Sequence, residues 1–186
     1  MGCEYLSECH QAYEDIEAHI DRLYAELSSE QLGWTPDEGS WSILQCIDHV
    51  TVVRERHLKE LRVAVQDGRE KGITGGEAPY GGETQLGQFL LDAFEKPEKL
   101  ETFDIFQASD RPDPEEIAQS FKEQNAILIV LADEADGLDL GRIEVGAPNP
   151  ELGITSLAEG FKLHVKHDAR HLAQAEAVRE AAGFPE

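Results

Sequence analysis

The chain has 186 residues, a length typical of one domain with its own hydrophobic core, so we expect residues 1–186 to form a single domain. Hydrophobic residues make up 40% and charged residues 29%, which excludes a disordered tail, and no apolar run reaches the roughly 20 residues of a membrane span. The net charge of -22 would repel phosphate backbones and anionic lipids, so neither nucleic acid nor a membrane is an expected partner.

The first half of the chain contains two segments with helical periodicity. Apolar residues recur at intervals of three and four over residues 5–28, which predicts a long helix that polar, glycine and proline residues end at 29–39. A second helix is predicted to begin after Ser42, because Gln45 stands at the capping-box position, and to end near Gly68.

The middle of the chain carries weaker signals. Residues 68–84 are rich in glycine and predict a flexible surface loop, long enough for a binding role. Residues 85–94 predict a short helix broken by Pro97, and residues 97–113 show no clear pattern. We therefore expect an inserted loop and short helix between the main helices.

The third long helix is predicted to begin at Asp113, a capping residue followed by Pro114 at the first helical position, and to end around Gly137. After a loop at 141–153, a fourth helix is predicted from the cap residue Ser156 to Ala182. Strand signals are nearly absent. Four amphipathic helices of this length predict an all-α protein, a four-helix bundle.

The three cysteines are odd in number and fall in no short metal-ligand spacing. We expect Cys46 to be packed in the core, whereas Cys3 and Cys9 lie near the terminus, where exposure is expected. The first residues lack the basic and apolar regions of a secretory signal. These features favour a reduced, cytoplasmic setting.

Three histidines of the fourth predicted helix interrupt its apolar stripe. At about 100° per residue, His164, His167 and His171 fall within roughly 60° of one another, in the sector that also holds Leu157 and Ala175. A buried imidazole loses solvation unless it binds a hydrogen-bond partner or a metal. Neighbours four apart, such as His167 and His171, can reach one ion, although two inward histidines are also compatible with a polar core network without metal.

A third ligand must come from another helix. His49 is the best candidate, although it lies at the flank of the apolar stripe of the second predicted helix, and His57 is a weaker alternative. His10 and His19 are expected at the surface. Neutral imidazoles suit zinc, nickel, copper or ferrous iron, so the pattern predicts a divalent metal ion and leaves its identity open.

Two further residues beside this stripe have alternative interpretations. Asp168 could be a ligand, but we favour a role in orienting an imidazole. His164 is either a partner of the ligands or an acid–base group beside the metal, and it is the one candidate catalytic residue.

Two segments around these residues resemble the DinB-like (YfiT-type) metal-dependent proteins. One runs from Trp41 to His49, with a tryptophan, a serine and a histidine seven residues after the serine. The other runs from Leu163 to Gln174, with a histidine–aspartate pair, a second histidine and a glutamine three places later. The resemblance covers roughly residues 5–65 and 145–183, and the middle of the chain matches the family pattern poorly.

The resemblance implies an up-down-down-up four-helix bundle, often a homodimer, with a metal triad of His49, His167 and His171 at one end of the bundle. Three protein ligands leave positions open for water or a substrate. Relatives in this family include transferases and isomerases that use bacillithiol, mycothiol or glutathione, so a low-molecular-weight thiol is implied as co-substrate, with a role in detoxification or stress.

Three functions remain open from the sequence. The first is transfer of a thiol to an electrophilic small molecule at the metal, with metal-assisted hydrolysis as a variant. The second is a metal-containing sensor or binding module without turnover. The third is a polar histidine network that holds no metal. No glycine-rich phosphate-binding motif is present, because the glycines at 75–82 lack the Gly-Lys-Ser/Thr ending.

Overall fold

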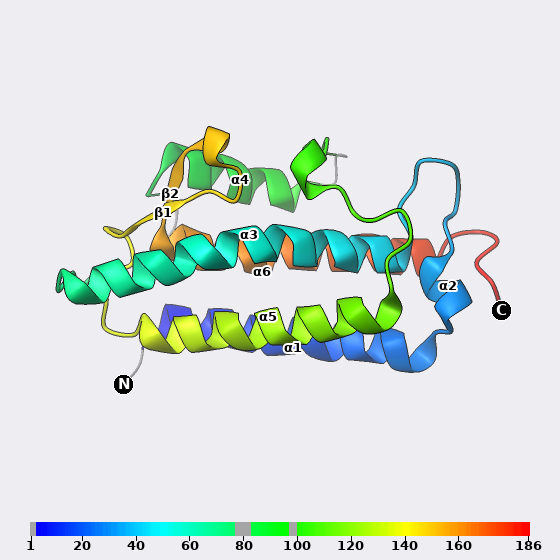
Figure 1. The fold of residues 1–186 in the computed structure, drawn as a ribbon, viewed down its shortest axis with the longest axis horizontal. Coiled ribbons are helices and arrows are strands. Elements are labelled where there is room, and N and C mark those ends of the chain that lie inside the picture. The colour runs from blue at the N-terminus through cyan, green and yellow to red at the C-terminus, as the bar shows by residue number, and fades with distance from the viewer. Residues whose placement is uncertain (1–2, 77–82, 97–99) are drawn as a thin grey trace.

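The structure is a computed structural model that describes residues 3–76, 83–96 and 100–186 (Figure 1). This part of the chain contains six α-helices, two short 3-10 turns and one two-stranded sheet. In chain order they are α1 (Glu4–Glu26), α2 (Ser29–Gly33), α3 (Ile43–Glu70), α4 (Gln85–Glu95), η1 (Asp104–Phe106), α5 (Pro114–Glu134), β1 (Glu144–Gly146), η2 (Pro150–Leu152), β2 (Ile154–Ser156) and α6 (Leu157–Arg179).

The four long helices α1, α3, α5 and α6 form the bundle, which confirms the expected all-α architecture. In Figure 1, α1 and α6 run in one direction and α3 and α5 in the opposite one, so the topology is up-down-down-up. Helix α3 packs against both α5 and α6, and α1 packs against the same two helices. None of the helices in the described ranges is long and apolar enough to cross a membrane.

Local side-chain caps explain where three of these helices begin. The Ser42 and Ser156 hydroxyls accept from the backbone N–H groups of Gln45 and Glu159, whose side chains accept from the two serine N–H groups in return. Asp113 accepts from two backbone N–H groups of the first turn of α5. The predicted starts of these three helices are therefore confirmed.

Helix ends and short elements differ from the expectation. Helix α1 ends at Glu26, before the expected Ser28, because Ser28 caps a separate, unexpected helix, α2. Helix α6 ends at Arg179, before Ala182. The expected loop at 141–153 contains β1, which pairs antiparallel with β2 through Val145 opposite Thr155. Strands of three residues are too short to show an alternating pattern.

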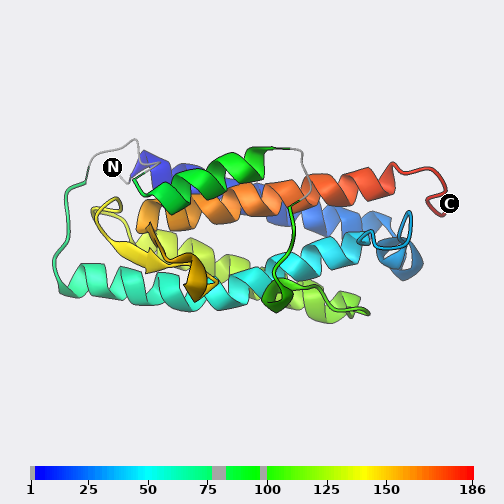
Figure 2. The same cartoon turned by 90° about the horizontal axis from the view of Figure 1, so that it is seen from above.

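Two described elements of the middle segment, α4 and η1, pack onto the outside of the bundle (Figure 2). Helix α4 lies on α6, where Lys166 pairs with Glu95 at 2.7 Å and the buried carboxylate of Glu159 accepts from Thr84. The turn η1 lies beside α3. The hydrogen bond from Ser109 N–H to the Asp48 carboxylate, at 2.6 Å, joins the segment after this turn to α3. Of the predicted glycine-rich loop, residues 77–82 lie outside the described residues, as does Pro97.

A buried polar layer divides the core in two. One apolar cluster includes Tyr13, Leu61 and Phe161. The other includes Ile47 of α3 and apolar residues near the C-terminal end of α6. The layer between them consists of seven buried polar side chains: His49, Arg54, His57, His164, His167, Asp168 and His171.

The burial of the cysteines agrees only in part with the expectation from the sequence. Cys46 is fully buried, as expected. Cys9 is buried as well, against the expectation of an exposed terminus, because α1 begins at Glu4 and already packs into the core there. Burial raises the pKa of both thiols to about 12, so neither is a reactive thiolate.

Candidate metal centre

The structure brings His49 of α3 together with His167 and His171 of α6. One nitrogen of each imidazole lies within 4.8 Å of the other two, and the Nε2 atoms of His49 and His167 are 3.1 Å apart. The three side chains are almost completely buried. The group lies between the two apolar clusters, in the second turn of α3 and in the middle of α6, rather than at the very end of the bundle.

Each ring has its other nitrogen turned to an acceptor outside the group. His49 Nδ1 lies 2.7 Å from the carbonyl oxygen of Phe106, and His171 Nδ1 lies 3.1 Å from the side-chain oxygen of Gln174. His167 Nδ1 lies 3.4 Å from a carboxylate oxygen of Asp168. Since oxygen acceptors need a donor, these partners place the ring hydrogen on Nδ1 and leave Nε2 as a lone pair in all three rings.

This arrangement fits a divalent metal ion. Two Nε2 lone pairs 3.1 Å apart repel each other unless a cation lies between them. Burial, first of all, and then the neighbouring His167 lower the pKa of His49 to about 4 and that of His171 to about 2, so both rings are neutral near pH 7 and available as ligands. Two nitrogens bound to one ion at about 2.0–2.1 Å lie roughly 2.8–3.4 Å apart, which matches the observed separation.

Aromatic side chains cover the three histidines. The Trp41 ring lies 4.9 Å from the His49 ring and 5.9 Å from that of His171. Phe94 of α4 lies 5.1 Å from the His167 ring. The middle segment, which matched the family pattern poorly, therefore supplies both a wall of the site and, through Phe106, a hydrogen-bond acceptor for one ring.

Asp168 is not one of the three potential ligands, but its carboxylate contacts the Nδ1 side of the His167 ring. Its Oδ2 accepts from Arg54 Nη2 at 2.6 Å and from Arg54 Nε at 3.0 Å, and both side chains are fully buried. Burial alone would raise the pKa of this carboxyl, but the Arg54 guanidinium outweighs it and keeps the pKa below the usual value. This geometry agrees with the expected orienting role.

His164, the candidate catalytic residue, is paired with His57. His164 Nε2 lies 2.9 Å from His57 Nδ1, and both side chains are almost fully buried. Burial, first of all, lowers the pKa of both groups, to about 4 for His57. The structure thus places His57 beside His164 rather than in the metal group, so it does not support His57 as the third ligand.

The remaining two histidines lie away from this layer. His10 and His19 are half-exposed on α1, where His10 lies 3.5 Å from Glu14 and His19 contacts Glu176 of α6. Both contacts are with carboxylates near the surface, in keeping with the expected surface positions.

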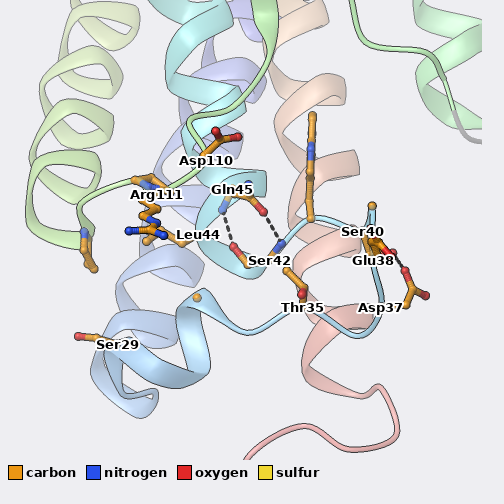
Figure 3. Close-up of a pocket in the computed structure, with 15 residues that line it drawn as sticks. Ser29, Thr35, Asp37, Glu38, Ser40, Ser42, Leu44, Gln45, Asp110 and Arg111 are labelled. Carbon is orange, nitrogen blue, oxygen red and sulfur yellow. Dashed lines mark hydrogen bonds between the residues drawn. The ribbon is translucent and has the colours of Figure 1, made fainter.

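A pocket of about 620 Å³ lies beside the site, between α2, the start of α3 and the segment that leads into α5 (Figure 3). Its walls include the charged side chains of Asp37, Glu38 and Arg111. Trp41 lines this pocket and also contacts two of the histidines, so the tryptophan lies between the pocket and the metal centre.

The model of the DinB superfamily matches residues 9–175, a range that includes all three histidines, the whole of α3 and α5, and most of α1 and α6. The chain belongs to the DinB superfamily. The resemblance seen in the two short segments is thereby confirmed over most of the chain. No curated protein and no solved structure matches the chain.

Two residues of this DinB superfamily site were missed in the sequence. Arg54 carried a usable signal, because it stands four residues after Val50 and four before Leu58 and so interrupts the apolar stripe of α3. The contribution of Phe106 had no such signal, because a backbone carbonyl can be supplied by any residue type.

Proposed function

We propose that this DinB superfamily protein is a metal-dependent enzyme that transfers a low-molecular-weight thiol to an electrophilic small molecule. The observation that carries the proposal is the convergence of three imidazoles, one nitrogen of each within 4.8 Å of the other two, while the Nδ1 atom of each ring has an outer acceptor. His49, His167 and His171 would hold zinc, nickel or ferrous iron and leave coordination positions open.

The metal ion and the side chains around it would have different roles in this reaction. When bound, a divalent ion lowers the pKa of a coordinating thiol so that the thiolate can attack an electrophile. The chain orients the three imidazoles through Phe106, Asp168 and Gln174. Trp41 and Phe94 pack against the rings and exclude water from them.

The hydrogen bonds of the Asp168 carboxylate favour thiol chemistry over hydrolysis. Hydrolysis at a metal normally needs a nearby general base, as the glutamate of the zinc proteases supplies. Asp168 contacts His167 of this group, and its two oxygens are already occupied by Arg54 and His167. A thiol needs no such base, because coordination itself favours the deprotonated form.

The pocket beside Trp41 supports a small-molecule co-substrate. Its volume of about 620 Å³ lies within the range of roughly 300–1,000 Å³ usual for small-molecule sites. Acidic groups such as Asp37 and Asp110 beside the cation Arg111 suit a ligand that carries both charges or several hydroxyl and amide groups.

One observation favours a second candidate, a metal-containing sensor or binding module without turnover. The exposed fractions of His49, His167 and His171 are only 4%, 7% and 9%. Access of a substrate to the ion therefore requires a displacement of the covering aromatic side chains, whereas a module that only holds the metal needs no such access.

Turnover separates the two candidates. Metal-reconstituted protein is incubated with monochlorobimane and, separately, bacillithiol, mycothiol, glutathione and cysteine, and fluorescent adduct formation is followed above the uncatalysed rate. We expect turnover with at least one thiol, its loss in His171→Ala, and unchanged turnover in His10→Ala, a half-exposed histidine outside the site. Metal-loaded protein that is inactive with every thiol would support the binding module instead.

A further inference from the structure

Arg54 and Asp168 form an ion pair that is completely enclosed in the bundle. Arg54 is 0% exposed and Asp168 is 2% exposed, and the guanidinium also stacks on the Phe121 ring at 4.2 Å. Both guanidinium contacts go to a single oxygen, Oδ2, at 3.0 and 2.6 Å. The second oxygen, Oδ1, is left facing His167 Nδ1 at 3.4 Å.

Stability does not explain such a pair. The free energy lost when two charges are removed from water often exceeds the free energy gained from their attraction. Replacing a buried ion pair with apolar side chains of similar size therefore often leaves a protein equally stable or more stable. The buried Nη1 of Arg54 also has no hydrogen-bond partner among the described residues, so the guanidinium is not fully compensated.

An apolar pair could fill the same space but could not orient an imidazole. The carboxylate oxygen Oδ1 accepts from His167 Nδ1, and this fixes Nε2 toward His49. Asp168 can keep that orientation only if its own rotation is prevented, and the two hydrogen bonds from Arg54 to Oδ2 prevent it.

We propose that Arg54 is a positioning residue of the metal centre, which holds Asp168 so that one carboxylate oxygen faces His167 and the His167 ring faces the ion. The chain of contacts runs from α3 to α6 through Arg54 and Asp168 and returns to α3 through His167 and His49. This inference rests on the metal-binding part of the proposed function and is independent of thiol chemistry.

The test compares metal affinity and fold stability in a set of variants. Dissociation constants for Zn²⁺ and Co²⁺ are measured by chelator competition, the Co²⁺ absorption spectrum reports coordination geometry, and urea unfolding of the metal-free protein reports stability. The variants are Arg54→Met, Asp168→Asn, Arg54→Lys and the apolar pair Arg54→Met with Asp168→Leu. The matched control neutralises the exposed pair Arg179–Glu26, which also joins α6 to another helix, as Arg179→Gln with Glu26→Gln.

Loss of an orienting partner typically costs about 10- to 100-fold in metal affinity. We expect that loss in Arg54→Met, in Asp168→Asn and in the apolar pair, with an altered Co²⁺ spectrum, a smaller loss in Arg54→Lys, which keeps the charge, and none in the control. The losses of the two single variants should not multiply, because both break the same chain of contacts.

The apolar pair keeps the inference falsifiable if a single variant leaves a buried charge and does not fold. An apolar pair that is folded and binds Zn²⁺ as tightly as the wild type would overturn the inference and reduce Arg54 to a packing residue. Wild-type protein that binds neither ion would overturn the metal centre itself, and with it the proposed function.

Discussion

The Nε2 atoms of His49 and His167 face each other at 3.1 Å, although both rings have already committed their Nδ1 hydrogens to oxygen acceptors outside the pair. With the ring hydrogens on Nδ1, the packing of α3 on α6 brings the lone pairs of these two Nε2 atoms toward each other. The three imidazoles thus form a cluster that could hold a cation, with outer hydrogen bonds that do not depend on an ion.

The first prediction concerns the protons released when the ion binds. Three histidines with the ordinary pKa of about 6.5 would release between two and three protons per ion at pH 5.5. Because the pKa of His49 is about 4 and that of His171 about 2, both are already neutral at that pH. We expect at most about one proton per ion, measured by calorimetric titration with Zn²⁺ in two buffers of different ionisation enthalpy. A release of two or more protons would contradict a preformed neutral site.

The second prediction is that the metal-free protein loses stability as the pH falls from about 6.5 toward 4. A folded-state pKa of about 4 for His57, below the unfolded value of 6.5, means that the unfolded chain binds the proton more tightly. The stabilising contribution is thus complete above pH 6.5 and is lost as the pH falls through this window. Between pH 7 and pH 5 we expect His57 alone to cost about 2 kcal/mol, measured by urea unfolding with a chelator present.

Paired substitutions check this assignment to the buried histidine layer. In His57→Leu with His164→Leu the decline between pH 7 and pH 5 should be shallower by at least that amount, since both lowered pKa values are removed. The variant His10→Ala removes a half-exposed histidine and should keep the wild-type slope. Equal slopes in all three proteins would show that the buried pair does not cause the effect.

The third prediction tests how α4 is held on the bundle. A Cβ added at Gly87 would collide with the carboxylate of Glu159, which accepts from Thr84 and from the backbone of Ser156. Gly87→Ala should therefore destabilise the protein by roughly 1–3 kcal/mol and increase hydrogen exchange in α4. Gly33→Ala, where a Cβ meets nothing within 4 Å, is the matched control and should be neutral or slightly stabilising.

The fourth prediction uses Trp41 as a reporter of the site. Its ring lies 4.9 Å from that of His49, whereas the other tryptophan, Trp34, packs on Phe184. In the variant Trp34→Phe, which leaves Trp41 as the one tryptophan of the chain, Ni²⁺ should quench most of the fluorescence at one equivalent. In Trp41→Phe the same addition should change the Trp34 signal little. Quenching of equal size in both variants would place the ion elsewhere.

Local sequence signals predicted most of the fold. The caps at Ser42, Asp113 and Ser156 use side chains within three residues of the helix start, so the sequence alone contains the whole interaction. The hairpin of β1 and β2 was not predictable in this way, because its register depends on contacts with α3 and α6 rather than on an alternating pattern.

The site was predictable to the extent that it lies on helical stripes. His167 and His171 interrupt the apolar face of one helix, and the segment around Trp41 and His49 resembled a known family. The pairing of His57 with His164 depends on how α3 and α6 are rotated about their axes, which periodicity fixes only to within a residue or so. The acceptor on Phe106 depends on the path of a segment without periodicity.

We expect one divalent ion to bind where the three imidazoles converge. Crystals of protein purified without a histidine tag and reconstituted with zinc or nickel allow anomalous diffraction at the edge of the added metal. We expect a single strong peak about 2 Å from the Nε2 atoms of His49, His167 and His171. No peak at that point, with the three rings hydrogen-bonded to one another or to water instead, would contradict the metal centre and the chemistry proposed for it.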